Sequence, residues 1–168
     1  SVLFIQYNVC ASDSEYPINS FIQDTVSLFS KNRFEHVIVD LRYNSGGNSQ
    51  LLVPLIDQLS VLQKQQDFSL DVLIGERTFS SAIINAMQII KKSDARLVGS
   101  ESGGSVNHYG ELKSFTLPHS NLPVQYSTKY FVMDAEHQGG SLNPDLRISP
   151  TIDDLLSGVD TVLDALLM

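Results

Sequence analysis

The segment Leu73-Ile-Gly-Glu-Arg-Thr-Phe-Ser-Ser-Ala-Ile-Ile-Asn-Ala86 passes from an apolar run through a short polar loop into a helical pattern. This order predicts a buried strand that is followed directly by a helix. Ser80 and Ser81 stand at the start of the helix, where unpaired backbone N–H groups and the positive end of the helix dipole favour an oxyanion. Ser80 is therefore a candidate nucleophile. The alternative is a plain helix cap, which is the commoner role of a serine at this position.

Similar units flank this segment on both sides. Short apolar runs that predict strands alternate with amphipathic patterns that predict helices. The predicted strands are 2–7, 37–39, 70–74 and 96–98, and the predicted helices are 18–32, 51–62 and 82–90. Such alternation with short loops predicts one α/β domain with a mostly parallel sheet and right-handed crossovers. Ligands of these folds bind at the carboxyl ends of the strands.

A second loop, Asp40-Leu-Arg-Tyr-Asn-Ser-Gly-Gly47, follows the preceding predicted strand and should face the same crevice as Ser80. Consecutive glycines let backbone N–H groups approach a ligand oxygen closely. Gly46 or Gly47 could therefore supply one oxyanion donor, with the N–H of Ser81 as the second. The alternatives are a tight turn and a phosphate-binding loop, but the chain contains neither glycine-rich nucleotide motif.

The remainder of the chain has a different pattern. Short apolar runs at 112–117, 124–126 and 128–133 predict a β-meander against the parallel core. The polar segment 134–143 predicts a mobile loop. Apolar residues at helical spacing within 159–167 predict a C-terminal amphipathic helix.

Composition narrows the possible functions. The chain has 168 residues with 42% hydrophobic content, which suits a single well-buried domain. Its net charge of −8 argues against nucleic acid or an anionic membrane as a partner. Cys10 is the only cysteine, so we expect a buried structural thiol and no intrachain disulfide. We expect Asp40 and Arg42 to form a structural pair that braces the glycine loop, and we expect no metal or cofactor, since no cluster has metal-ligand spacing.

Several motifs occur here in the order in which they occur in a known protease family. They are Asp40 to Gly47, Thr78-Phe-Ser-Ser-Ala82, Leu97-Val-Gly99, Gly103-Gly104 and Asn143-Pro-Asp145. The first is similar to the Asp-Leu-Arg-x-Asn-x-Gly-Gly motif of the carboxyl-terminal processing, or tail-specific, serine proteases, and the second resembles their nucleophile segment. The resemblance implies a crotonase/Clp-protease-like core of βα units and peptide hydrolysis through an acyl-enzyme. It places the nucleophile at Ser80 and the following N–H at Ser81.

The chain departs from the commonest form of that family, which pairs the serine with a lysine. Ser105 stands at the lysine position, so the chain resembles the variant that lacks the catalytic lysine. Relatives such as the tricorn and chlamydial proteases use a histidine and a glutamate instead, and Glu136 is the nearest match to that glutamate. His108 is the best histidine within the chain, but we expect the base to lie in a longer upstream region.

We expect residues 1–168 to be a single peptidase core domain, the C-terminal fragment of a longer protein. We expect a serine-type endopeptidase that acts on proteins or peptides and is inactive or nearly so as the isolated fragment. The resemblance implies an extracytoplasmic location. We expect no membrane insertion, because the chain has no stretch of about 18 apolar residues. The alternative is a non-catalytic ligand- or peptide-binding module, because retinoid-binding relatives use the same scaffold without peptidase activity.

Overall fold

Short apolar segments pair into a parallel sheet in the computed structural model, which describes residues 1–137 and 139–168. The strand order is β1-β2-β3-β4-β7, and neighbouring strands are parallel throughout. The strands are β1 (Val2–Gln6), β2 (His36–Asp40), β3 (Ser69–Ile74), β4 (Ala95–Gly99) and β7 (Leu146–Arg147). Almost all side chains of β2 and β3 are buried, as is usual for central parallel strands. The predicted α/β class with a mostly parallel sheet is confirmed.

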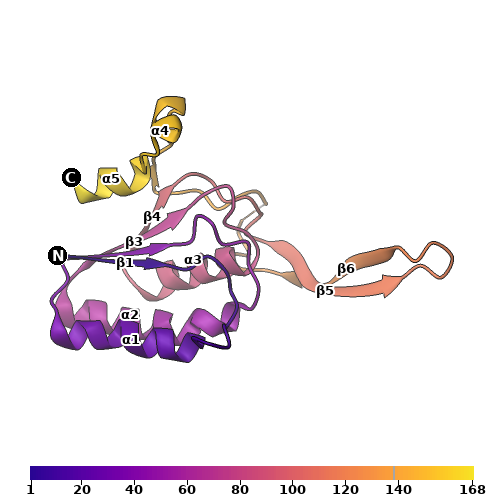
Figure 1. Ribbon diagram of the computed structural model, residues 1–168, viewed down its shortest axis with the longest axis horizontal. Helices are drawn as coiled ribbons and strands as arrows, with labels where there is room; N and C mark the ends of the chain where they lie inside the picture. The colour runs from indigo at the N-terminus through magenta and orange to yellow at the C-terminus, as the bar shows by residue number, and fades with distance from the viewer. Residues whose placement is uncertain (138) are drawn as a thin grey trace.

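Helices cover both faces of the sheet (Figure 1). Their bounds are α1 (Ile18–Lys31), α2 (Val53–Gln66) and α3 (Ser81–Lys92) on one face, and α4 (Ile152–Ser157) and α5 (Thr161–Leu167) on the other side; a 3-10 helix, η1 (Ser49–Leu52), leads into α2. Because successive strand side chains point to opposite faces, Val37 and Val39 pack into the core beneath α1 to α3. Ile38 between them packs against Val162 of α5. The side chains of β2 thus contribute to hydrophobic clusters on both faces of the sheet.

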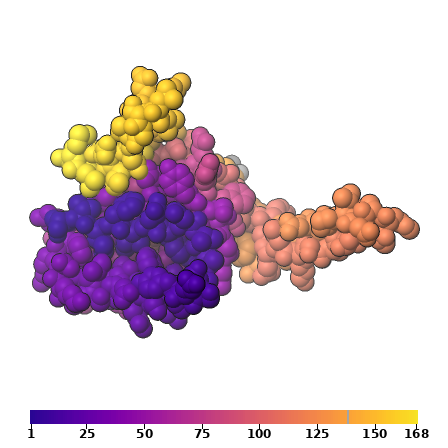
Figure 2. Space-filling model, in the orientation of Figure 1, coloured from indigo at the N-terminus to yellow at the C-terminus, as the bar shows by residue number. Residues whose placement is uncertain are grey.

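The predicted β-meander is a two-stranded ribbon instead. β5 (His108–Thr116) and β6 (Pro123–Phe131) pair antiparallel in a sheet of their own and project from the body (Figures 1 and 2). The runs predicted as two strands, 124–126 and 128–133, are largely one continuous strand because Ser127 pairs with Leu112 and carries the ladder onward. The ribbon forms a separate sheet, and most of its aromatic side chains are exposed: Tyr109, Phe115, Tyr126 and Tyr130.

The carboxyl ends of the central strands lie at one edge of the sheet. The register pairs Asp40 with Leu73 and Ile74 with Gly99, so β2, β3 and β4 end side by side. The loops that follow them, 41–48, 75–80 and 100–107, therefore begin next to one another. This is the edge at which ligands of parallel α/β sheets bind.

Candidate active site

Ser80 has a backbone conformation that a helix cap does not require. Its φ is 52° and its ψ is −119°, which is the geometry of a turn position normally filled by glycine. A side chain held there stores about 1–3 kcal/mol of strain. The side chain of Ser80 makes no capping hydrogen bond to α3. The plain capping role considered from the sequence therefore does not describe this residue.

Gly46 lies directly against Ser80. A Cβ atom built on Gly46 would stand 2.9 Å from the Cβ of Ser80, 3.1 Å from the carbonyl oxygen of Phe79 and 3.2 Å from the amide nitrogen of Ser81. Its φ of 106° is also one that other residues rarely adopt. The glycine loop and the start of α3 thus meet at one place, as the strand order predicted.

The backbone N–H groups at this meeting point differ in their availability. The N–H of Gly46 donates to Oδ1 of Asn44 at 2.9 Å, so it is already occupied. Among the described residues, the N–H groups of Gly47 and Ser81 donate to no partner. The hydroxyl of Ser81 donates to the carbonyl oxygen of Gly47 at 2.6 Å and joins the two segments. Of the two glycines considered as oxyanion donors, only Gly47 keeps a free N–H.

The glycine loop is held from its other side by Cys10. The N–H of Cys10 donates to the carbonyl of Gly46 at 2.9 Å, and the N–H of Asn48 donates to the carbonyl of Cys10 at 2.7 Å. A Cβ on Gly47 would stand 2.3 Å from the Cys10 carbonyl oxygen, so only glycine fits there. The thiol is buried, and burial raises its pKa. Cys10 thus holds the loop through its backbone, and its protonated thiol also donates to Oδ1 of Asn44 at 3.4 Å.

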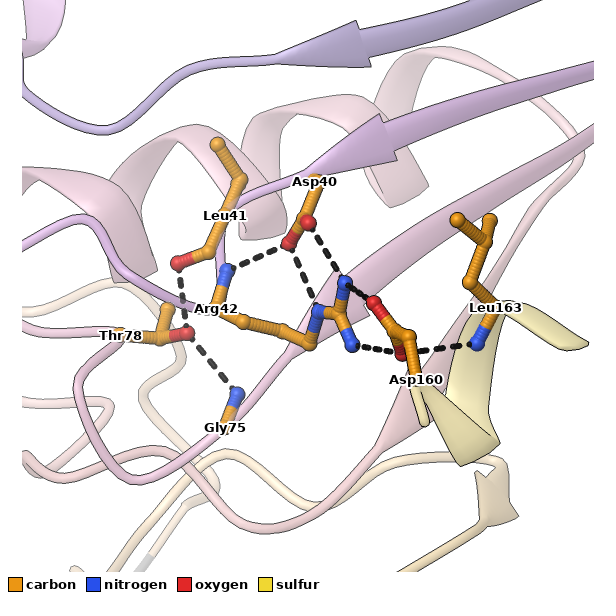
Figure 3. A network of polar contacts seen from close by, with 7 residues as sticks. All are labelled: Asp40, Leu41, Arg42, Gly75, Thr78, Asp160 and Leu163. Atoms are coloured by element: carbon orange, nitrogen blue, oxygen red, sulfur yellow. Dashed lines mark hydrogen bonds and ion pairs between the residues drawn. The ribbon is translucent and has the colours of Figure 1, made fainter. Parts of the chain in front are cut away.

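Arg42 lies at the centre of an ionic network below the loop (Figure 3). Its guanidinium donates to both carboxylate oxygens of Asp40, at 3.0 and 2.7 Å, and to both of Asp160, at 2.6 and 2.7 Å. Burial disfavours the charge of Arg42, but the hydrogen bonds to Asp160 and Asp40 outweigh it and raise its pKa. The Asp40–Arg42 pair predicted from the sequence is present, and Asp160 is a partner that the sequence did not indicate.

Thr78 joins the network to the turn that carries Ser80. Its buried hydroxyl donates to the carbonyl of Leu41 at 2.9 Å and accepts from the N–H of Gly75 at 2.9 Å (Figure 3). One residue further on, the N–H of Phe79 donates to the carbonyl of Asn44 at 3.0 Å. The loop after β2 and the loop after β3 are therefore tied together at two points.

His108 has one ring nitrogen anchored and one without a partner. Nδ1 lies 3.0 Å from the carbonyl oxygen of Ser105, which can only accept, so Nδ1 carries the proton. Nε2 is buried and, within the described residues, hydrogen-bonds to nothing. In a neutral imidazole this arrangement leaves the lone pair on Nε2. No hydrogen bond joins His108 to Ser80 in the described part of the chain.

Glu136 is exposed, and its side chain forms no hydrogen bond with His108 or Ser80 among residues 1–137 and 139–168. The structure therefore does not bring it into contact with the other candidate residues. His36, at the amino end of β2, pairs through Nε2 with Asp71 at 2.9 Å, away from the loops. His137 lies 3.3 Å from the carbonyl of Gly140.

Neither a metal site nor a membrane-spanning helix occurs among residues 1–137 and 139–168. No group of three or more His, Cys, Asp and Glu side chains there is arranged to hold a metal ion. None of the helices described combines the length and the apolar character that crossing a membrane requires. A cleft of about 650 Å³ lies beside Arg42, between the loops after β2 and β3 and the C-terminal segment, and Asp160 lines it.

Comparison with known proteins shows a likeness of fold rather than of sequence. No family model and no curated protein matches the amino-acid sequence. The match to mature CPAF complexed with lactacystin covers 98% of this chain and 50% of the CPAF chain, with a TM-score of 0.71 and 14% sequence identity. A protein from Parabacteroides merdae, assigned provisionally as a peptidase, matches 99% of this chain and 60% of its own, with a TM-score of 0.67 and 18% identity. The match to the photosystem II D1 C-terminal processing protease covers 90% of this chain and 43% of the protease chain, with a TM-score of 0.59 and 14% sequence identity.

These values show that the chain has the fold of these peptidases, as its ordered motifs predicted. The chain spans 43% to 60% of the length of these three proteins. At such low identity the likeness concerns the fold alone. The roles of individual residues are inferred from the geometry of the site.

Proposed function

We propose that this chain is the core of a serine-type endopeptidase in which Ser80 is the nucleophile. One observation carries the proposal: Ser80 has a strained backbone against Gly46, and among the described residues the N–H groups of the next residue along each segment, Ser81 and Gly47, donate to no partner. A serine that only caps a helix makes a side-chain bond and needs no strain, whereas Ser80 makes no such bond. The fold shared with peptidases supports the same conclusion.

The proposed reaction is acyl transfer. The hydroxyl oxygen of Ser80 attacks the scissile carbonyl while a base takes its proton. The N–H groups of Gly47 and Ser81 then hold the oxyanion, and each such donor is worth roughly 100- to 1,000-fold in rate. The base returns the proton to the leaving amine, and water hydrolyses the acyl-enzyme.

The base has two candidate sources. The lone pair on Nε2 of His108, with Nδ1 anchored on a backbone carbonyl, is chemically suited to accept a proton. The other source is a histidine from a region of the protein outside this chain, oriented by Glu136. We favour the second source, because no hydrogen bond connects His108 with Ser80 in the described residues.

The proposed substrates are proteins or peptides, and the proposed location is extracytoplasmic. The motif resemblance and the peptidase fold support the substrate proposal, and the motif resemblance alone supports the location. A region outside this chain would complete the catalytic machinery. A binding module on the same scaffold is the competing hypothesis. It requires no nucleophile, so covalent labelling separates the two.

The test is labelling of the full-length protein by a fluorophosphonate probe. Ser80→Ala should abolish labelling. Ser93→Ala is the matched control, because Ser93 lies at the other end of α3 and its hydroxyl, within the described part of the chain, bonds only to the carbonyl of Ile89. It should label like the natural protein. A natural protein that resists the probe, yet binds peptide equally well with serine or alanine at position 80, would support the binding module instead.

A second comparison identifies the base. If a histidine outside the chain acts, His108→Gln in the full-length protein should label normally, and residues 1–168 alone should label very slowly. If His108 acts, the isolated chain should label as fast as the full-length protein, and His108→Gln should abolish labelling in both.

A further inference from the structure

The C-terminal segment, residues 149–168, is attached to the core in two ways. Val162 of α5 packs on Ile38, Leu73 and Val98, which face the side of the sheet opposite α1 to α3. Asp160, which precedes α5, reaches the ionic network of Arg42. Leu163 and Leu166 of α5 also pack on this cluster, whereas α4 carries exposed Leu155 and Leu156 and stands off the body (Figures 1 and 2).

The Asp160–Arg42 contact has the geometry of a strong pair. Each carboxylate oxygen of Asp160 accepts one guanidinium hydrogen bond, at 2.6 and 2.7 Å. Such bidentate, charge-assisted pairs fix orientation as well as distance. The hydrogen bond from Arg42 holds the pKa of Asp160 below its ordinary value. Asp160 also accepts from the N–H of Leu163 at 3.1 Å, so it caps α5 at the same time.

Arg42 is a central residue of a tight turn, which places the pair close to the candidate site. The turn closes with a hydrogen bond from the N–H of Asn44 to the carbonyl of Leu41 at 3.1 Å. The same Leu41 carbonyl accepts from Thr78, and the carbonyl of Asn44 accepts from Phe79, the neighbour of Ser80. Hydrogen bonds and the covalent backbone of the turn at 41–44 therefore connect Asp160, through Arg42, with Thr78 and Phe79, the residues that precede Ser80. Figure 3 shows the part of this path from Asp160 to Gly75.

We propose that Asp160 is a positioning residue for the reaction, acting through Arg42 on the turn that aligns Gly47 and Ser80. The inference rests on the proposed function of Ser80. Its physical basis is that a strained residue persists only where its surroundings over-determine it. Without the pair, the turn at 41–44 loses a constraint on Arg42, and both loops gain freedom. Small displacements of a catalytic group lower a rate steeply.

The experiment compares Asp160→Asn with Asp164→Asn in the full-length protein. Asparagine at 160 keeps the size of the side chain and its ability to cap α5, but it loses the charge-assisted pair with Arg42. Asp164 is an exposed aspartate of the same helix, and no ion pair involving it occurs among the described residues. Asp160→Asn should lower the maximal rate of fluorophosphonate labelling roughly 10-fold with an unchanged half-saturating probe concentration, whereas Asp164→Asn should not change it.

Hydrogen exchange gives a readout that needs no activity. In Asp160→Asn, amides at 41–47 and 78–82 should exchange faster, while amides of α1 should not change. Equal labelling and equal exchange in the two variants would overturn the proposal. Faster exchange throughout the chain, α1 included, would overturn it too, because it would indicate general destabilisation. A natural protein that does not label at all would refute the nucleophile assignment, and the exchange pattern would still test the link from Asp160 to the loops.

Discussion

Replacing Gly46 by alanine tests the contact on which the candidate site depends. The new methyl group would stand 2.9 Å from the Cβ of Ser80 and 3.1 Å from the carbonyl oxygen of Phe79, which is closer than side-chain carbons normally approach. The φ of 106° adds backbone strain of about 1–3 kcal/mol. Crowding of the new methyl group in this packed region should cost about 1–3 kcal/mol more in the free energy of unfolding.

A matched control separates the two costs. Gly139 has a φ of 107°, and a Cβ built on it would meet no atom within 4 Å. Gly139→Ala therefore carries the backbone strain of Gly46→Ala without the crowding. The difference between the two variants should be about 1–3 kcal/mol in the free energy of unfolding.

Urea unfolding of both variants measures this difference, provided that the slope with denaturant is unchanged. Gly46→Ala should also displace the hydroxyl of Ser80 and abolish probe labelling in the full-length protein, while Gly139→Ala should label normally. Equal destabilisation by the two substitutions, with labelling retained in both, would refute the close approach of the glycine loop to Ser80. The oxyanion proposal would then fail with it.

Three further predictions concern the same region. Ser80→Gly should stabilise the protein by about 1 kcal/mol in a thermal or urea melt, because relief of about 1–3 kcal/mol of strain exceeds the added freedom of glycine in the unfolded chain; an unchanged or lower stability would contradict the strain. Thr78→Val should cost about 1–3 kcal/mol, since it leaves the buried N–H of Gly75 without its acceptor; a neutral effect would show that this bond contributes nothing. The pKa of Asp160 is lowered in the folded state, so its stabilising contribution is full above the ordinary carboxyl pKa of about 3.9 and is lost as the pH falls through the lower folded value. Natural protein and Asp160→Asn should therefore differ in stability at pH 6, and the difference should shrink as the pH falls below about 3.9; a difference that does not shrink in acid would contradict this.

Local patterns were sufficient to predict the sheet and the meeting of the two loops. The strands at 37–39 and 70–74 are short, apolar and followed by helical periodicity, and parallel neighbours must place their following loops at one edge. The position of Ser80 opposite the glycine loop follows from that rule alone. The proximity of Gly46 and Ser80 was predictable for the same reason, although the individual distances were not.

Features that depend on distant pairing were not predictable. Asp160 meets Arg42 across 118 positions, and the periodicity around Asp160 indicates only a helix start. The bond from Gly46 to Asn44 depends on one side-chain rotamer, so either glycine could be considered a donor. The ribbon of β5 and β6 was predicted to lie on the core because its strands alternate apolar and polar residues. Alternation does not specify which surface, if any, the apolar face contacts.

The strain energy at Ser80 is comparable to the stabilisation that the surrounding hydrogen bonds provide together. Strain of about 1–3 kcal/mol exceeds the net contribution of a single hydrogen bond, which is about 1 kcal/mol. Three separate parts of the chain supply the bonds: Cys10 holds the glycine loop, Thr78 and Asn44 tie the two loops together, and Asp160 holds Arg42. Since no single one of these balances the strain, the conformation of Ser80 requires them jointly. Loss of any one should therefore affect the nucleophile before it affects the fold, and the variants of Asp160 and Thr78 can each show this separately.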